Sequence, residues 1–148
     1  MKRYIALVCL MAGCAMAQTK SAVGTWKFDP AQSQNAAFKS ANLVITKDDP
    51  NAIAWRLSGT DQDGKPIHES FSEKRETEGP IKGMPGEKAT WHKDGSFDFT
   101  TADGQTQHRT TSLSDDGKTM TVTGTMGGKD VKEVWVRTDK AKTAAANP

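Results

Sequence analysis

The side chains best suited to chemistry in this sequence are three histidines, His68, His92 and His108. Imidazole binds metals and carries protons near neutral pH. No histidine lies two or four residues from another, so the local spacing typical of a metal site is absent. The three could still meet across strands, together with Glu69, but strand alternation favours solvent-facing positions for them.

An acidic motif, Asp61-Gln62-Asp63-Gly64, resembles the start of a calcium loop. Such a loop ends on a glutamate and has a helix on each side. Ser72 stands at the position of that glutamate, and the flanks have strand patterns, so we predict a hairpin turn. The sequence contains no Gly-x-Ser-x-Gly elbow for a serine nucleophile. We expect no enzyme activity, no catalytic residues, no bound metal and no cofactor.

Large apolar side chains at alternating positions form a further candidate site. Ile53, Trp55 and Leu57 alternate with Ala54, Arg56 and Ser58, and Phe97 and Phe99 alternate with polar residues. Alternation places such residues on one face of a strand. These inward residues are either the core alone or, in part, the wall of a pocket. For a pocket, the predicted ligand-binding residues are Trp55, Glu69, Phe71, Trp91, Phe97 and Phe99.

Glu69 is the polar member of this predicted set. It shares a strand face with Ile67 and Phe71. A carboxylate buried without a partner is unfavourable. If Glu69 points inward, it is therefore a candidate polar anchor for a ligand.

The strands that must position these residues can be predicted from the dense turn signals between them. Asp-Gly and Gly-Gly pairs separate short runs rich in Val, Ile, Thr, Trp and Phe, a spacing typical of a β-sandwich or barrel. We predict a short helix or an irregular crossover over residues 30–40, and a long loop over residues 76–87. We predict nine strands, over residues 23–29, 42–47, 52–59, 66–74, 88–92, 96–101, 106–113, 119–124 and 131–138.

The first residues have the pattern of a secretory signal peptide. Lys2 and Arg3 precede an apolar run, and Ala15-Met16-Ala17 forms a small-x-small site. The run is shorter than the roughly 20 residues that span a bilayer. We therefore expect a signal peptide over 1–17, one domain over 18–139, a disordered tail over 140–148, and a periplasmic or extracellular location. Met11-Ala12-Gly13-Cys14 resembles a bacterial lipobox, so a lipid anchor at Cys14 is the alternative.

Charge and cysteine content limit the partners. The formal charge of +2 equals the contribution of Lys2 and Arg3, so the rest of the chain has no net charge. Nucleic acid, which requires clustered positive charge, is not an expected partner. Both cysteines, Cys9 and Cys14, lie in the predicted signal peptide, so we expect no disulfide in the domain.

The segment Val23-Gly24-Thr25-Trp26-Lys27 resembles the opening of lipocalin-like proteins, in which a Gly-x-Trp begins the first strand. Those proteins commonly place a basic residue of the last strand across that tryptophan, and Arg137 stands in the matching position. The resemblance implies an up-and-down β-barrel closed by contact between Trp26 and Arg137. The chain also resembles a group of small secreted bacterial proteins, which implies no mechanism.

Two hypotheses of function follow. The first is an exported, lipocalin-like, all-β protein, an antiparallel up-and-down barrel of about nine strands that binds a small, partly apolar ligand. The second is a non-enzymatic envelope or surface protein that binds another macromolecule through its outer face. An interior pocket would favour the first, and a filled barrel with an exposed apolar patch would favour the second.

Overall fold

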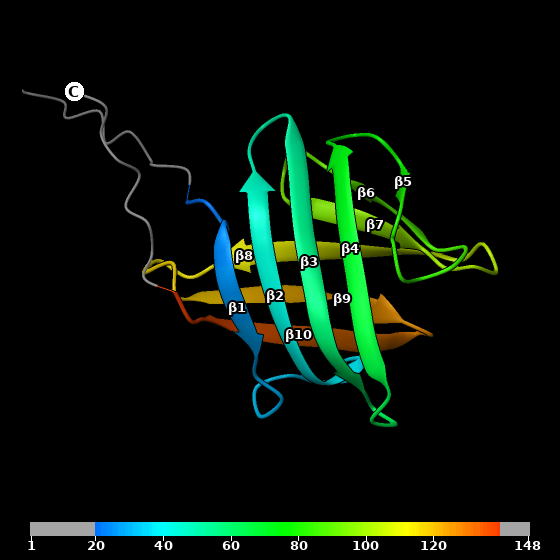
Figure 1. Cartoon of the computed structure of the whole chain (residues 1–148), viewed down its shortest axis with the longest axis horizontal. Coiled ribbons are helices and arrows are strands. Elements are labelled where there is room, and N and C mark those ends of the chain that lie inside the picture. The colour runs from blue at the N-terminus through cyan, green and yellow to red at the C-terminus, as the bar shows by residue number, and fades with distance from the viewer. Residues whose placement is uncertain (1–19, 140–148) are drawn as a thin grey trace, which may run out of the picture.

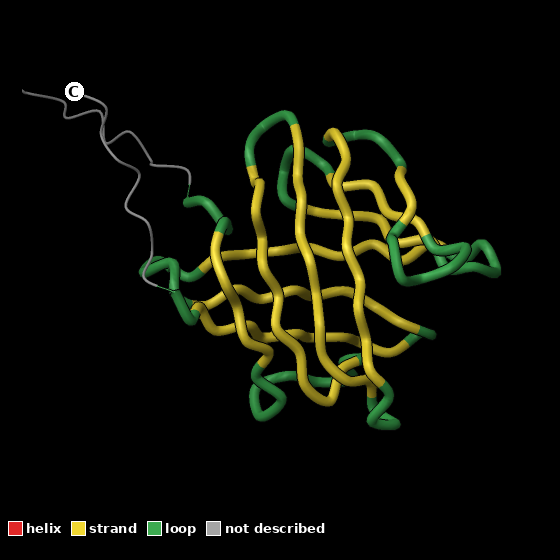
Figure 2. Tube along the Cα trace, in the orientation of Figure 1, coloured by secondary structure: helices red, strands yellow, loops and turns green. Residues whose placement is uncertain are grey.

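The computed structural model describes residues 20–139, which form ten antiparallel strands and no helix (Figure 2). The first five are β1 (Gly24–Phe28), β2 (Phe38–Asp48), β3 (Ala52–Asp61), β4 (Pro66–Lys74) and β5 (Gly79–Pro80). The others are β6 (Lys88–Trp91), β7 (Ser96–Thr100), β8 (Thr106–Leu113), β9 (Thr119–Met126) and β10 (Lys129–Arg137).

The strands form one sheet that is nearly closed into a barrel. Its order is β4-β3-β2-β1-β10-β9-β8-β7-β6-β5, so each strand pairs with a neighbour in sequence and β1 pairs with β10. In Figure 1, β1 to β4 cross in front of β8, β9 and β10. The seam lies between β4 and β5, where Ser70 and Lys82 exchange backbone hydrogen bonds of 3.0 and 2.9 Å. The prediction of an all-β, antiparallel, up-and-down barrel is confirmed.

The predicted number of nine strands is too low by one. The additional strand is β5, which lies in the predicted loop over 76–87 and pairs Gly79 with Ala89 and Pro80 with Lys88. Glycine and proline are depleted in strands, so the segment has no strand pattern of its own. It is extended because it pairs with the longer β6 beside the seam.

A short helix or an irregular crossover was expected over residues 30–40, and the structure has the irregular crossover. Gln34 and Lys132 exchange backbone hydrogen bonds of 2.8 and 3.0 Å, which hold the segment against β10. The second strand then begins at Phe38, ahead of the expected residue 42, with a register shift between Phe38 and Ser40. A bulge interrupts the alternation there, which is why the pattern did not reveal the start of the strand.

The contact predicted between the first and last strands is present. Trp26 and Arg137 are direct partners in the β1–β10 register. The Arg137 guanidinium carbon lies 4.2 Å from the centroid of the Trp26 ring, which is fully buried. Arg137 also donates hydrogen bonds to the carbonyls of Val23, Gly117 and Ser21. Trp26 Nε1 donates to the carbonyl of residue 22 at 2.8 Å, so this end of the barrel is closed by satisfied polar groups.

The acidic motif forms the predicted hairpin turn, between β3 and β4. Asp61 Oδ1 accepts hydrogen bonds from the backbone N–H groups of Asp63 and Lys65, at 2.9 and 2.8 Å. Gly64 has a φ of 81°, the left-handed conformation that such turns need.

The remaining predictions on the organisation of the chain concern its two ends. The predicted signal peptide, the alternative anchor at Cys14 and the tail over 140–148 all lie outside the described residues. Among residues 20–139 there is no helix with the length and hydropathy to cross a bilayer.

Candidate functional site

The barrel encloses a cavity of about 720 Å³, lined by side chains from both crossing layers of strands. Known small-molecule pockets fall in the range of about 300–1,000 Å³. Strand alternation creates the cavity, because the inward residues of β3, β4, β7, β8 and β10 project toward a common centre. The interior is therefore large enough to hold a small molecule.

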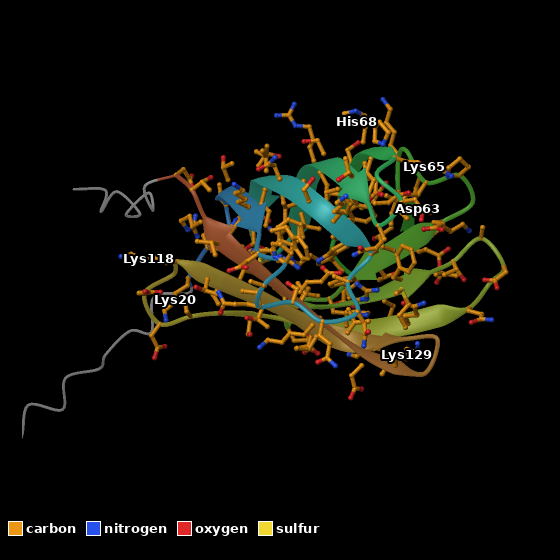
Figure 3. The ribbon with its side chains drawn as sticks, turned by 90° about the horizontal axis from the view of Figure 1, so that it is seen from below. Lys20, Asp63, Lys65, His68, Lys118 and Lys129 are labelled. Carbon is orange, nitrogen blue, oxygen red and sulfur yellow. The ribbon has the colours of Figure 1, made fainter. Side chains whose placement is uncertain are left out.

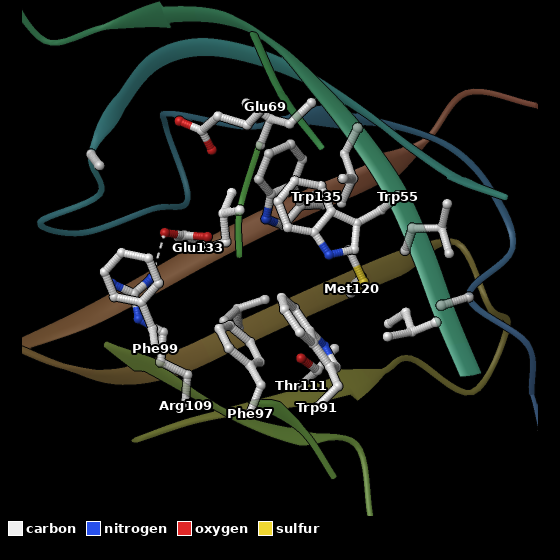
Figure 4. Close-up of a pocket in the computed structure, with 18 of the residues that line it drawn as sticks. Trp55, Glu69, Trp91, Phe97, Phe99, Arg109, Thr111, Met120, Glu133 and Trp135 are labelled. Carbon is white, nitrogen blue, oxygen red and sulfur yellow. Dashed lines mark hydrogen bonds and ion pairs between the residues drawn. The ribbon is translucent and has the colours of Figure 1, made fainter. Parts of the chain in front are cut away.

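One part of the wall is aromatic. Trp91 of β6 stacks on Phe97 of β7, with ring centroids 4.4 Å apart and planes 13° apart. The Trp55 ring of β3 meets Trp91 edge-on at 5.8 Å. Figure 4 shows Trp55, Trp91 and Phe97 around the same space, with Met120 beside them. This part of the wall offers flat apolar surface to a ligand ring or chain.

Five of the six predicted ligand-binding residues line the cavity, namely Trp55, Glu69, Trp91, Phe97 and Phe99. Phe71 differs, since it is buried behind the wall with 3% of its surface exposed. It is the register partner of Trp55, and its ring packs 4.8 Å from that of Trp91. Phe71 therefore supports the two tryptophans and does not face the cavity.

The opposite part of the wall contains a buried ion pair that the sequence analysis did not identify. Arg109 Nη1 lies 3.1 Å from Glu133 Oε1, and Arg109 Nη2 donates to Gln107 at 3.3 Å. The ionic side chains are 12% and 7% exposed. Parity along the strands could have revealed them, because Arg109 shares a strand face with Leu113, and Glu133 shares one with Trp135. Charged side chains are seldom fully buried, so residue type alone did not indicate that these two face inward.

The cavity lining contains further carboxylates besides Glu133. Burial raises the pKa of Glu69 to about 7, and the charges of Glu87 and Glu133 contribute to this rise. Burial also raises the pKa of Glu87, with a contribution from Asp103. The pKa of Glu133 is raised by burial and lowered in part by Arg109. Negative charge is therefore disfavoured in the interior.

Some buried polar atoms of the wall lack a hydrogen-bond partner within the described residues. They include Trp55 Nε1, Glu87 Oε2 and Arg109 Nε. An unsatisfied buried polar group costs about 1–3 kcal/mol. A ligand with suitable polar atoms could satisfy these groups.

The histidines lie away from the cavity. His92 bonds Glu76 through Nδ1 at 2.7 Å and Asp98 through Nε2 at 2.8 Å, and His108 Nδ1 lies 2.7 Å from the same Asp98. His68 stands apart on the outer side of β4 (Figure 3). The possible meeting of histidines with Glu69 does not occur, because Glu69 faces inward. Over residues 20–139, no three His, Cys, Asp or Glu side chains are grouped so that they could hold a metal ion.

The fold and the cavity define a lipocalin-like β-barrel. Solved structures of similar shape include the wild-type fluorescent protein UnaG, with a TM-score of 0.58 and 20% sequence identity over 78% of this chain and 96% of that chain. A mutant of UnaG also has a TM-score of 0.58, at 17% identity over 80% of this chain and 96% of that chain. At these identities the similarity establishes the fold alone. Comparison with protein-family models and with curated proteins found no match.

Proposed function

We propose that this protein is an exported, non-enzymatic barrel that binds a small, partly apolar molecule in its interior. The observation that carries the proposal is the cavity of about 720 Å³ with its aromatic wall. Side chains at the centre of a closed barrel normally fill such space. Here the inward tryptophans and phenylalanines leave it open, which supports a binding role for them.

The outer face gives less support to the alternative, binding of another macromolecule. Among the described residues, the exposed large hydrophobic side chains are Met126 and Val136, at 36% and 38% of their surface. Met126 also lines the cavity. Two separate residues do not make the contiguous apolar patch expected of a docking surface. The interior is therefore the better-supported site.

Tryptophan emission tests the binding role directly. Trp55 and Trp91 line the cavity, so a bound apolar compound should shift or quench their emission in a saturable way. We would titrate a panel of fatty acids, isoprenoids, aromatic acids and aromatic amines. Phe97→Ala or Phe99→Ala should weaken the fitted affinity while the protein stays folded.

A core phenylalanine provides the matched control. Phe28 is 4% exposed, packs 5.4 Å from Trp135 and does not line the cavity. Phe28→Ala should lower stability by about 3–5 kcal/mol, as truncation of a core ring does, without a selective effect on affinity. A panel without any saturable change would argue against the binding role and favour an outer-face function.

Export is supported by the N-terminal sequence pattern of Lys2, Arg3 and Ala15-Met16-Ala17. Intact mass and N-terminal analysis of the protein recovered from the cell envelope should give a chain that starts at Gln18. A lipidated chain that starts at Cys14 would establish the anchored alternative, and a full-length chain in the cytoplasm would contradict export.

A further inference from the structure

We propose that the polar group of the ligand is a cation, a protonated amine carried on an aromatic or aliphatic body, and that Glu69 and Glu87 receive it. This inference rests on the proposed binding function and specifies its ligand. It follows from the balance of charge in the cavity wall, from a buried carboxylate oxygen without a partner among the described residues, and from the arrangement of the aromatic rings.

The basic side chains of the cavity lining are already neutralised. The lining contains five carboxylates and three basic side chains. Each basic group forms an ion pair within the described chain: Arg109 with Glu133, Arg75 with Asp48, and Lys20 with Asp115. Arg109 Nε has no partner among the described residues, but a ligand anion there would lie beside the Glu133 carboxylate that already pairs with the same guanidinium. Such like-charge contact is unfavourable in a buried site.

Three carboxylates of the lining have no basic partner within residues 20–139, and two of them are free to act on a ligand. Asp61 is the exception, because its Oδ1 accepts two backbone hydrogen bonds in the β3–β4 turn. Glu69 projects from β4, and the charges that act on it are the carboxylates of Glu87 and Glu133. Glu87 Oε2 is buried without a partner among the described residues. A cation between Glu69 and Glu87 would compensate both groups.

An independent observation indicates a ligand in the same space. The Trp55 side chain is nine-tenths buried, with 9% of its surface exposed, and faces the cavity (Figure 4). Its Nε1 has no acceptor within residues 20–139. An indole N–H can only donate. The ring face of an aromatic ligand body would supply an acceptor that residues 20–139 do not.

The arrangement of the wall gives the ligand a direction. In Figure 4, Glu69 and Glu133 lie at one side of the cavity, and Trp55 and Trp91 at another. The apolar body would lie against the stacked pair Trp91 and Phe97, whose ring centroids are 4.4 Å apart. The ammonium would then reach the carboxylates past aromatic surfaces that also attract cations.

Calorimetry on the full chain with three matched probes tests the inference: phenylbutylamine, phenylbutanol and phenylbutyrate. At about pH 8, where Glu69 is largely ionised, the amine should bind about tenfold tighter than the alcohol, and the acid weaker than the alcohol. Glu69→Gln keeps the shape and removes the charge. It should weaken the amine about tenfold and leave the alcohol unchanged.

The control variant is His68→Gln, on the outer face of the same strand, which should change none of the three affinities. Equal affinity for the amine and the alcohol, tightest binding of the acid, or an amine affinity unaffected by Glu69→Gln would each overturn the inference. In these cases, binding of the alcohol would leave the proposed function intact. If none of the three probes bound, both the proposed binding function and the inference of a cationic ligand would be contradicted.

Discussion

Arg109 and Glu133 form an ion pair across β8 and β10 inside the barrel, with Nη1 and Oε1 3.1 Å apart. The pair faces the same cavity as the aromatic wall. Since both side chains are nearly inaccessible to solvent, each depends on the other for compensation of its charge. The pair therefore fixes the chemical character of one side of the cavity and leaves Glu69 and Glu87 without a basic partner within the described residues.

This dependence predicts an asymmetric response to mutation. Arg109→Met leaves the Glu133 carboxylate buried and unpaired, and should lower the free energy of unfolding by about 3–5 kcal/mol. The double variant Arg109→Met with Glu133→Leu removes both charges and should recover most of that loss. Urea unfolding of the single and double variants measures both values. A single variant as stable as the wild type would show that the pair is not desolvated.

A second prediction concerns closure of the barrel. Arg137→Ala removes the stacked guanidinium and three hydrogen bonds to carbonyls at the β1–β10 junction. The variant should lose about 2 kcal/mol of stability. Arg137→Lys keeps the charge without the planar fork and should lose less. A melting temperature unchanged in Arg137→Ala would mean that the contact with Trp26 contributes nothing to closure.

A third prediction concerns the pH dependence of stability. The pKa of Glu69 is about 7 in the folded protein, whereas an unperturbed glutamate, as in the unfolded chain, has a pKa of 4.5. Between these values the folded state binds more protons, so the contribution of Glu69 to stability decreases as pH rises from about 4.5 to about 7. Glu87 and Glu133 have raised pKa values and act in the same direction.

Glu69→Gln should remove the Glu69 part of this dependence. Above about pH 7, where the wild type carries the charge, the variant should melt at a higher temperature than the wild type. Melting curves over a pH series measure the effect, with His68→Gln as the control on the outer face. A variant that melts below the wild type across the alkaline range would show that the Glu69 carboxylate has a stabilising partner.

The sequence predicted the barrel because alternation and turn chemistry act locally. Phe97 and Phe99 alternate with polar neighbours, and Gly64 occupies a turn position that requires positive φ. The strand Gly79–Pro80 was missed because it depends on pairing with β6 and has no local pattern.

The candidate site was predictable in its aromatic half and not in its ionic half. Trp55 and Trp91 showed their inward orientation through size and spacing. Arg109 and Glu133 are charged, and only the assembled barrel brings them close enough to be buried together. Whether the interior is open or filled depends on packing across the barrel, between strands that are distant in sequence, so alternation could not decide it.

Binding of a small molecule in the interior can be followed through the indole N–H signals of the four tryptophans. Trp55, Trp91 and Trp135 line the cavity, whereas Trp26 lies outside the lining and donates to a backbone carbonyl. In an NMR titration with the neutral probe phenylbutanol, we expect saturable shifts for Trp55 and Trp91 and an unchanged signal for Trp26. Shifts confined to backbone amides of the outer face, or no saturable indole shift, would contradict the proposed function.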